Sequence, residues 1–336
     1  MTAAPPVTAR PPIGVLVHGD TKPDQLVPVC RRIEDAGFGA VWLAEDYFLL
    51  GGPTSAALAL QGTREIPVGI GILSAVVRHP AVTAMEVATL SLAHPGRLIT
   101  GIGHGVPFWT KQMGLYPKSP LKSLQVVIDS VRALLDGETL TIDEGPYVFD
   151  NVTLTHPNPG AVPLYSGVIG PKSLELSGRI ADGTIMSVIA APKYLDYART
   201  TIAKGAVGSP REGQPHAMPT FVIYRVDTDR DVARRSAREG LAFYLQAVGP
   251  TPMTGVYGIN DQLGEILALG DLAAITDALP DEWVDTFTIC GTPPECVDRI
   301  KEFLAAGATS VVLAPYPAAA NDEILALTAE QVLPHL

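Results

Sequence analysis

The sequence predicts an α/β fold, namely a (β/α)8 TIM barrel with insertions after strands 4 and 7. Short apolar segments alternate with longer amphipathic segments along most of the 336 residues. The first four apolar segments begin at residues 13, 40, 67 and 97, so their starts lie 27, 27 and 30 residues apart, as in successive βα units. They are apolar on both faces, which is typical of parallel strands covered by helices. The competing architecture is an open, doubly wound sheet.

In the first hundred residues, turn and capping residues set the boundaries of the elements. Gly37 is a suitable C-terminal cap for the first helix, and Pro80 is favoured in the first turn of the third. We therefore expect strands over 13–18, 40–44, 67–73 and 97–102, with helices over 23–36, 53–62 and 80–93.

Two later stretches, 103–161 and 227–309, are longer than a βα unit requires and are predicted to be insertions on one barrel. The first holds a helix over 119–135, with apolar residues at helical spacing, and a surface hairpin over 137–155. The second is mostly helical, and a capping box of Thr292 and Glu295 begins its last helix. The remaining strands are expected at 162–166, 183–188, 219–226 and 310–314, with helices at 173–181 and 192–203 and from residue 321. Residues 13–336 are expected to form one domain behind a flexible arm, residues 1–12, that contains four prolines.

Composition excludes several classes of function. Lys and Arg number 24 against 35 Asp and Glu, a net charge of −11, which argues against nucleic-acid binding. No apolar run approaches the roughly 20 residues of a membrane helix. The three cysteines (Cys30, Cys290 and Cys296) are scattered and no signal peptide is visible, so a cytoplasmic protein is expected. No Cys/His cluster has metal-ligand spacing, so no metal site is expected.

The carboxyl ends of the strands, where barrels carry their active sites, hold the candidate residues. His18 and Asp46 follow the first two strands, and His104 lies in a glycine-rich loop after the fourth. Each could move a proton or hydrogen-bond a cofactor, or be merely structural. The loop over 167–173 joins a strand to a helix start, so it either binds a phosphate, aided by Lys172, or is an ordinary turn.

Five stretches (37–48, 67–90, 95–105, 165–187 and 290–315) resemble the bacterial luciferase-like superfamily of flavin- and deazaflavin-dependent oxidoreductases. The most similar branch includes methylenetetrahydromethanopterin reductase. The resemblance spans almost the whole chain and implies a barrel that binds a flavin-type ring at its carboxyl-terminal mouth. It also implies a homodimer.

The resemblance assigns residues to this site. A non-prolyl cis peptide behind the ring matches Gly71–Ile72, and the loop after strand 4 matches Gly103-His104-Gly105. The phosphate loop matches Ile169-Gly170-Pro171, and Gly167 and Lys172 of the same loop are further candidates for cofactor binding. We also expect Leu50, Phe108 and Trp109 to form apolar walls of the pocket. Three departures stand out: Glu45-Asp46 replaces an Asp-His pair, Val106 replaces a glutamate, and SAVV precedes Arg78 in place of an Asn-Pro turn.

The expected function is transfer of a hydride from reduced coenzyme F420 to an activated C=C or C=N bond of a small-molecule or peptide-like organic substrate. His104 or Asp46 is the preferred proton donor or cofactor polariser, and His18 is a further candidate. The first alternative is an FMN-dependent monooxygenase that uses O2 with a partner reductase. A non-catalytic flavin-binding relative is the second.

Overall fold

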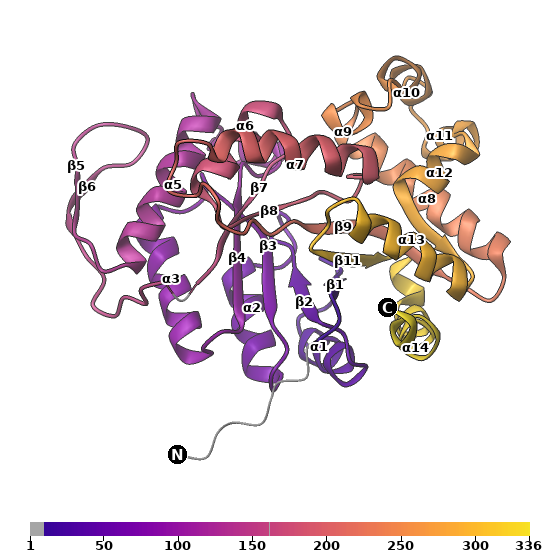
Figure 1. Cartoon of the computed structure of the whole chain (residues 1–336), viewed down its shortest axis with the longest axis horizontal. Helices are drawn as coiled ribbons and strands as arrows, with labels where there is room; N and C mark the ends of the chain where they lie inside the picture. Colours follow the sequence, from indigo (N-terminus) through magenta and orange to yellow (C-terminus); the bar gives the residue numbers. More distant parts are fainter. Residues whose placement is uncertain (1–9, 161) are drawn as a thin grey trace.

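A parallel sheet forms the centre of the computed structural model, which describes residues 10–160 and 162–336 (Figure 1). Most of the predicted arm, residues 1–9, therefore lies outside the described residues. The strands follow the order β10-β9-β11-β1-β2-β3-β4-β7-β8. They comprise β1 (Ile13–Val17), β2 (Ala40–Leu43), β3 (Val68–Ser74), β4 (Leu98–Gly103), β7 (Leu164–Gly167), β8 (Gly183–Ile185), β9 (Pro219–Val226), β10 (Thr288–Gly291) and β11 (Ser310–Pro315).

The sheet returns on itself between β8 and β9. Two parallel bridges, Gly183–Ala217 and Met186–Thr220, join the last strand of the order to the β9 segment. The Thr184 N–H donates to the Ala217 carbonyl at 2.7 Å across this seam. On the other side, β1 pairs with β11, so that Ile13 lies beside Val311. Eight strands thus follow one another in a ring, as the predicted TIM barrel requires.

The short strand β10 is additional to the eight strands that the sequence predicts. It pairs with Ile223–Val226 of β9, beyond the point where β8 touches that strand. Because β11 takes the opposite edge of β9, β8 and β10 share the remaining edge. Helix α12 (Asp281–Phe287) leads directly into β10, so no polar turn separates the two elements in the sequence.

Helices cover the outside of the sheet, close to the predicted ranges. Those of the βα units are α1 (Leu26–Asp35), α2 (Gly52–Gly62), α3 (Pro80–Ala93), α6 (Pro171–Ile180), α7 (Pro192–Ala206) and α14 (Asn321–Gln331), with short 3₁₀ turns at Ala318–Ala320 and Leu333–His335. The first insertion contains α4 (Pro107–Gln112), α5 (Pro120–Leu135) and the hairpin β5 (Leu140–Ile142) and β6 (Phe149–Val152), at left in Figure 1. The second contains α8 (Arg230–Val248), α9 (Pro252–Gly255), α10 (Asn260–Leu267), α11 (Leu272–Ala278), α12 and β10, followed by α13 (Pro293–Ala305), which begins with the predicted capping box.

Trp42 fills the interior below the mouth. Its ring meets Phe221 of β9 edge-on, with the ring centroids 5.3 Å apart. The neighbouring strands make room for it with glycine, since a Cβ on Gly69 would lie 2.4 Å from the indole. A Cβ on Gly71 would lie 3.0 Å from Phe221. This aromatic pair therefore supports the segment of β3 that carries the predicted cis peptide.

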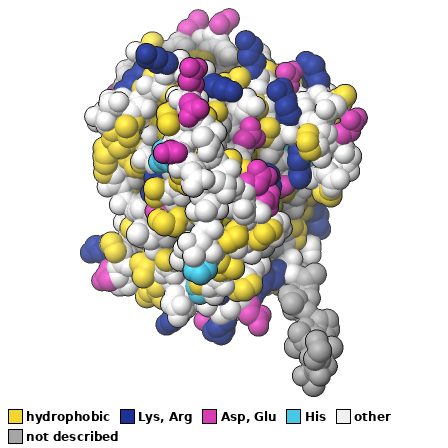
Figure 2. Space-filling view, turned by 90° about the vertical axis from the view of Figure 1, so that its left-hand side faces the viewer, with side chains coloured by type: hydrophobic (Ala, Val, Ile, Leu, Met, Phe, Trp, Pro, Cys, Tyr) yellow, Lys and Arg dark blue, Asp and Glu magenta, His cyan; other side chains and the backbone are white. Residues whose placement is uncertain are grey.

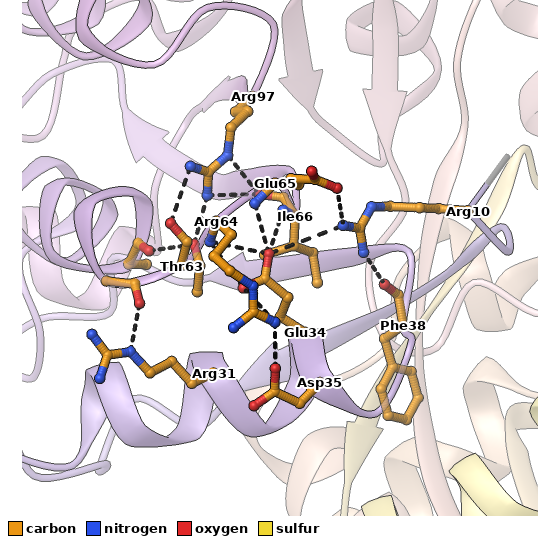
Figure 3. A network of polar contacts seen from close by, with 12 residues as sticks. Arg10, Arg31, Glu34, Asp35, Phe38, Thr63, Arg64, Glu65, Ile66 and Arg97 are labelled. Carbon is orange, nitrogen blue, oxygen red and sulfur yellow. Dashed lines mark hydrogen bonds and ion pairs between the residues drawn. The ribbon is translucent and has the colours of Figure 1, made fainter. Parts of the chain in front are cut away.

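A polar network ties Arg10 to α1 and to the segments before β3 and β4 (Figure 3). The buried Glu34 carboxylate accepts the N–H groups of Arg64, Glu65 and Ile66 at 2.7–2.9 Å. Arg10 donates to the Phe38 carbonyl, and the Val311 N–H donates to Pro12. Residues 10–12 of the predicted arm are thus attached to the barrel.

On the surface, acidic, basic and hydrophobic side chains are interspersed on the face that carries the hairpin (Figure 2). None of the helices described is long and apolar enough to cross a membrane. Within the same residues, no group of three or more His, Cys, Asp or Glu side chains could hold a metal ion.

Candidate active site

His18 and Asp46 lie at the ends of adjacent strands, as predicted. His18 follows β1, and its Nε2 is buried without a hydrogen-bond partner in the described part of the chain. Burial lowers the pKa of His18, opposed by a hydrogen bond with the backbone of Pro315. Asp46 follows β2, and burial raises the pKa of its carboxyl. An imidazole and a carboxyl group, both biased toward their neutral forms, therefore follow two adjacent strands at the mouth.

Two tyrosines extend this group toward β11. Burial, together with the negative charge of Asp46 and the proximity of Tyr316, raises the pKa of Tyr244 to about 12. Tyr244 comes from α8, so the second insertion contributes to the mouth. Tyr316 directly follows β11, a position that marks it as a candidate from sequence alone, whereas Tyr244 has only helical spacing and gives no such signal.

Glu45, the neighbour of Asp46, is occupied by structural contacts. Its carboxylate forms an ion pair with Arg78 and accepts hydrogen bonds from the Gly52 N–H and the Tyr47 hydroxyl, each at 3.0 Å. These contacts join the loop after β2 to the start of α2 and to the loop after β3. Of the two acidic residues in this pair, only Asp46 is left free for chemistry.

The peptide bond Gly71–Ile72 is cis, as the resemblance implied, and it lies at an irregularity in the pairing of β3 with β4. The Ile72 side chain packs over two glycines of the adjacent strands. A Cβ on Gly103 would lie 2.5 Å from its Cδ1, and a Cβ on Gly167 would lie 2.6 Å from its Cγ2. The predicted residues Gly71, Ile72, Gly103 and Gly167 therefore form one contiguous floor.

His104 connects the two helices that flank this floor. Its Nε2 lies 3.2 Å from the Ser173 hydroxyl in the first turn of α6. Burial lowers the pKa of His104, opposed by a hydrogen bond with the Pro120 carbonyl at the start of α5. Because partners from both helices engage the imidazole, the geometry favours a positioning role for His104 over proton transfer.

The start of α6 has the features of an anion site. Its N-cap, Gly170, provides no side chain, and the first turn contains no acidic residue. The N–H groups of Lys172 and Ser173 have no acceptor among the described residues, and a Cβ on Gly170 would meet nothing within 4 Å. Pro171 occupies the first helical position, and the Tyr194 hydroxyl holds the Ile169 carbonyl at 2.7 Å. Free N–H groups at the positive end of a helix fit the phosphate group of a flavin-type cofactor.

Apolar side chains form the rim. Phe108, on α4, is 66% exposed, whereas Trp109 packs edge-on against Tyr47 with the ring centroids 6.1 Å apart. Leu50 packs against the core, so only part of this predicted wall faces outward. Phe48, which the sequence did not suggest, is 69% exposed on the loop after β2. Exposed aromatic residues around a mouth are typical of a site for a flat organic ligand.

Comparisons with known proteins agree with this arrangement. The model of the luciferase-like monooxygenase family matches residues 7–310. A 5,10-methylenetetrahydromethanopterin reductase of Methanolobus tindarius is 30% identical over 287 residues, which cover 84% of this chain and 87% of the relative. An F420-dependent glucose-6-phosphate dehydrogenase of Nakamurella multipartita is 28% identical over 94% of this chain and 93% of its own.

A solved structure extends the likeness to three dimensions. The coenzyme F420-dependent tetrahydromethanopterin reductase of Methanopyrus kandleri superimposes with a TM-score of 0.84 at 26% identity, covering 96% of this chain and 98% of the other. Because the family model covers most of the chain, the protein belongs to the luciferase-like monooxygenase family.

Proposed function

We propose that the protein is an F420-dependent oxidoreductase that transfers a hydride to an activated C=C or C=N bond of an organic substrate. The observation that carries this proposal is the free start of α6 beside the floor of Gly103, Gly167 and Ile72. A phosphate group at the start of α6 and a planar ring packed against the floor would account for both features. Relatives named as F420-dependent support the choice of a deazaflavin over FMN.

The chain contributes binding, orientation and a proton. Coenzyme F420, when bound, supplies the hydride. The floor of Ile72, Gly103 and Gly167 would hold one face of the ring, and the apolar rim would exclude water from the other. Asp46 is our candidate for holding the proton that the substrate needs, since burial raises its pKa and none of the described residues forms an ion pair with it. His18, whose Nε2 has no hydrogen-bond partner among the described residues, is our candidate for a hydrogen bond to the ring or the substrate.

The first test is a fluorescence titration of purified, cofactor-free protein with coenzyme F420 and, separately, with FMN. We expect micromolar or tighter binding of F420 and much weaker binding of FMN. A screen of C=C and C=N acceptors with reduced F420 would follow, with Asp46→Asn as the variant that should lose turnover and keep affinity. Binding of FMN alone would contradict the proposal and favour the oxygen-dependent monooxygenase.

The Ser173→Asp variant tests the phosphate position. A carboxylate in the first turn of α6 stabilises the helix by about 0.3–1 kcal/mol, so the thermal midpoint should not fall. The same charge repels a phosphate, so we expect the Kd for F420 to rise at least about tenfold. Ser173→Ala, which adds no charge, should change the Kd by less than about threefold. The deazaflavin riboside, which has no phosphate, should bind both variants equally; if Ser173→Asp weakens the riboside as much as F420, the phosphate does not lie at α6.

A further inference from the structure

Helix α8 presents one face to the mouth of the barrel, on the side of β9 and β11. A Cβ on Gly240 would lie 3.0 Å from Cγ of Tyr316, which follows β11, and 3.2 Å from Cγ2 of Ile223. Ile223 shares the inner face of β9 with Phe221. Tyr244 comes four residues after Gly240 and therefore lies on the same face, one turn further along the helix. The second insertion thus places a tyrosine side chain at the mouth.

The Tyr244 hydroxyl is a hydrogen-bond donor that no neighbour uses. It bonds to none of the described residues and is not enclosed, so it reaches open space. Burial, followed by the negative charge of Asp46, raises the pKa of Tyr244 to about 12, which keeps the hydroxyl protonated at neutral pH. Phe243 fixes the ring, since the two rings meet edge-on with their centroids 5.7 Å apart. A fixed, neutral donor of this kind suits a substrate oxygen.

Asp46 is a second polar group at a separate position. It follows β2, and β1 separates that strand from β11. Its carboxyl forms no ion pair with the described residues, and burial raises its pKa. Because the charge of Asp46 acts on Tyr244, the two groups face the same space. The mouth therefore holds two protonated groups that approach a ligand from different sides.

Two such groups match one of the two bond types in the proposed function. Hydride addition to a C=N bond leaves the charge on the nitrogen next to the reacting carbon, so a single acid completes the reaction there. Hydride addition to a C=C bond conjugated to a carbonyl moves the charge to the carbonyl oxygen, whereas the proton is needed at carbon. That reaction requires a donor at the oxygen and an acid at the carbon.

We infer that the substrate is an α,β-unsaturated carbonyl compound whose carbonyl oxygen accepts a hydrogen bond from the Tyr244 hydroxyl. This inference rests on the proposed function and narrows it to the conjugated C=C bond. Phe48, Leu49 and Phe108, exposed on the loop after β2 and on α4, suit the hydrocarbon part of such a compound. Tyr244 is then a catalytic residue that the second insertion adds to the barrel.

The step conserves atoms and electrons. A hydride from reduced F420 forms a C–H bond at the β carbon, and the π electrons of the C=C bond move to the carbonyl oxygen, which gives an enolate. The Tyr244 O–H donates to that oxygen and stays intact. The Asp46 carboxyl then gives its proton to the α carbon, the carbonyl re-forms, and water returns a proton to Asp46. The substrate gains the hydride and one proton, so both electrons come from reduced F420.

Three small probes test the inference with reduced F420: 2-cyclohexenone, cyclohexene, which lacks the carbonyl, and 1-pyrroline, which offers a C=N bond. We expect 2-cyclohexenone to be reduced at least about tenfold faster than the other two. Tyr244→Phe should lower kcat for 2-cyclohexenone about 100-fold and keep the Kd for F420 within about threefold. The matched control is Tyr197→Phe on α7, on the outside of the barrel, which should change neither quantity.

A binding measurement gives a readout other than turnover. The negative charge of 4-nitrophenolate lies on an oxygen conjugated to a ring, as in the enolate, and its absorbance reports binding. With oxidised F420 bound, Tyr244→Phe should raise the Kd for 4-nitrophenolate at least about tenfold, because a charge-assisted hydrogen bond is lost. The Tyr197→Phe variant should bind this probe as the wild type does.

The outcomes separate this inference from the proposed function. If F420 does not bind, both fail. If F420 binds but 1-pyrroline is reduced in preference to 2-cyclohexenone, the proposed function stands and the inference is wrong. An unchanged kcat in Tyr244→Phe would also overturn it, and so would a Kd for F420 that rises as much as kcat falls, since Tyr244 would then support the whole site. If none of the three probes is reduced, equal binding of 4-nitrophenolate by wild type and Tyr244→Phe overturns the inference, and weaker binding by the variant supports it.

Discussion

Replacing Gly205 by alanine is expected to destabilise the protein by about 3 kcal/mol. Gly205 of α7 faces the backbone of α6, where an added Cβ would lie 1.9 Å from the Glu175 carbonyl oxygen. The reciprocal contact is equally close, since a Cβ on Gly178 would lie 2.0 Å from the Ile202 carbonyl oxygen. Backbone atoms cannot move aside as a side chain can, so the two helices must separate.

Urea unfolding of the variant measures the loss. The matched control is Gly264→Ala in α10, where an added Cβ would meet nothing within 4 Å. Alanine in an open helix interior should stabilise the protein by about 0.5–1 kcal/mol. Since α6 also provides the proposed phosphate position, Gly205→Ala should weaken F420 binding as well. If Gly205→Ala and Gly264→Ala changed the unfolding free energy equally, close packing of α6 against α7 would not be the cause of the destabilisation.

Glu34→Ala is the second substitution with a large expected effect. Three backbone N–H groups, those of Arg64, Glu65 and Ile66, lose their acceptor (Figure 3). At about 1–3 kcal/mol for each buried donor left unpaired, partly offset by entry of water, we expect a loss of about 3 kcal/mol. Glu302→Ala, which removes an exposed carboxylate paired with Arg299, should cost less than about 1 kcal/mol.

The effect of Glu34 should depend on pH. Burial alone would raise the pKa of this carboxyl, but the hydrogen bonds from Glu65, Arg64 and Ile66 outweigh it, and the pKa is lowered. A carboxyl whose pKa is lower in the folded state stabilises the protein above its unfolded pKa of about 4.3, and this contribution is lost as the pH falls further. The difference in unfolding free energy between wild type and Glu34→Ala should therefore be constant near neutrality and shrink below about pH 4. If the difference in unfolding free energy stayed constant down to pH 3, the negative charge of Glu34 would not be the source of its contribution to stability.

Much of the fold could be predicted because long elements leave periodic patterns. The helix over 119–135 and the capping box at Thr292 are both found where the sequence indicates them. The strand β10 could not be predicted, because four residues between two helices give no period of their own. It forms because residues Ile223–Val226 of β9 offer it an edge to pair with, and only the folded barrel provides that edge.

The sequence predicts where the candidate site residues lie better than it predicts what each of them does. The barrel rule places His18, Asp46 and His104 at the mouth, and the structure has them there. Sequence could not tell that Glu45 is held by Arg78 while Asp46 is free, since the two acids are adjacent and chemically alike. The place of Tyr244 at the mouth depends on where the second insertion folds back, and no local pattern in the sequence encodes that.

The pairing of β1 with β11 has a consequence for the order of folding. Ile13 pairs with Val311, a separation of 298 residues in sequence (311 − 13). During synthesis the first strand must wait, one edge unpaired, until nearly the whole chain has emerged from the ribosome. Long-range pairing of this kind is slow, and exposed strand edges promote aggregation. The yield of active protein should therefore depend on chaperones that shield the N-terminal half while β11 is still being made.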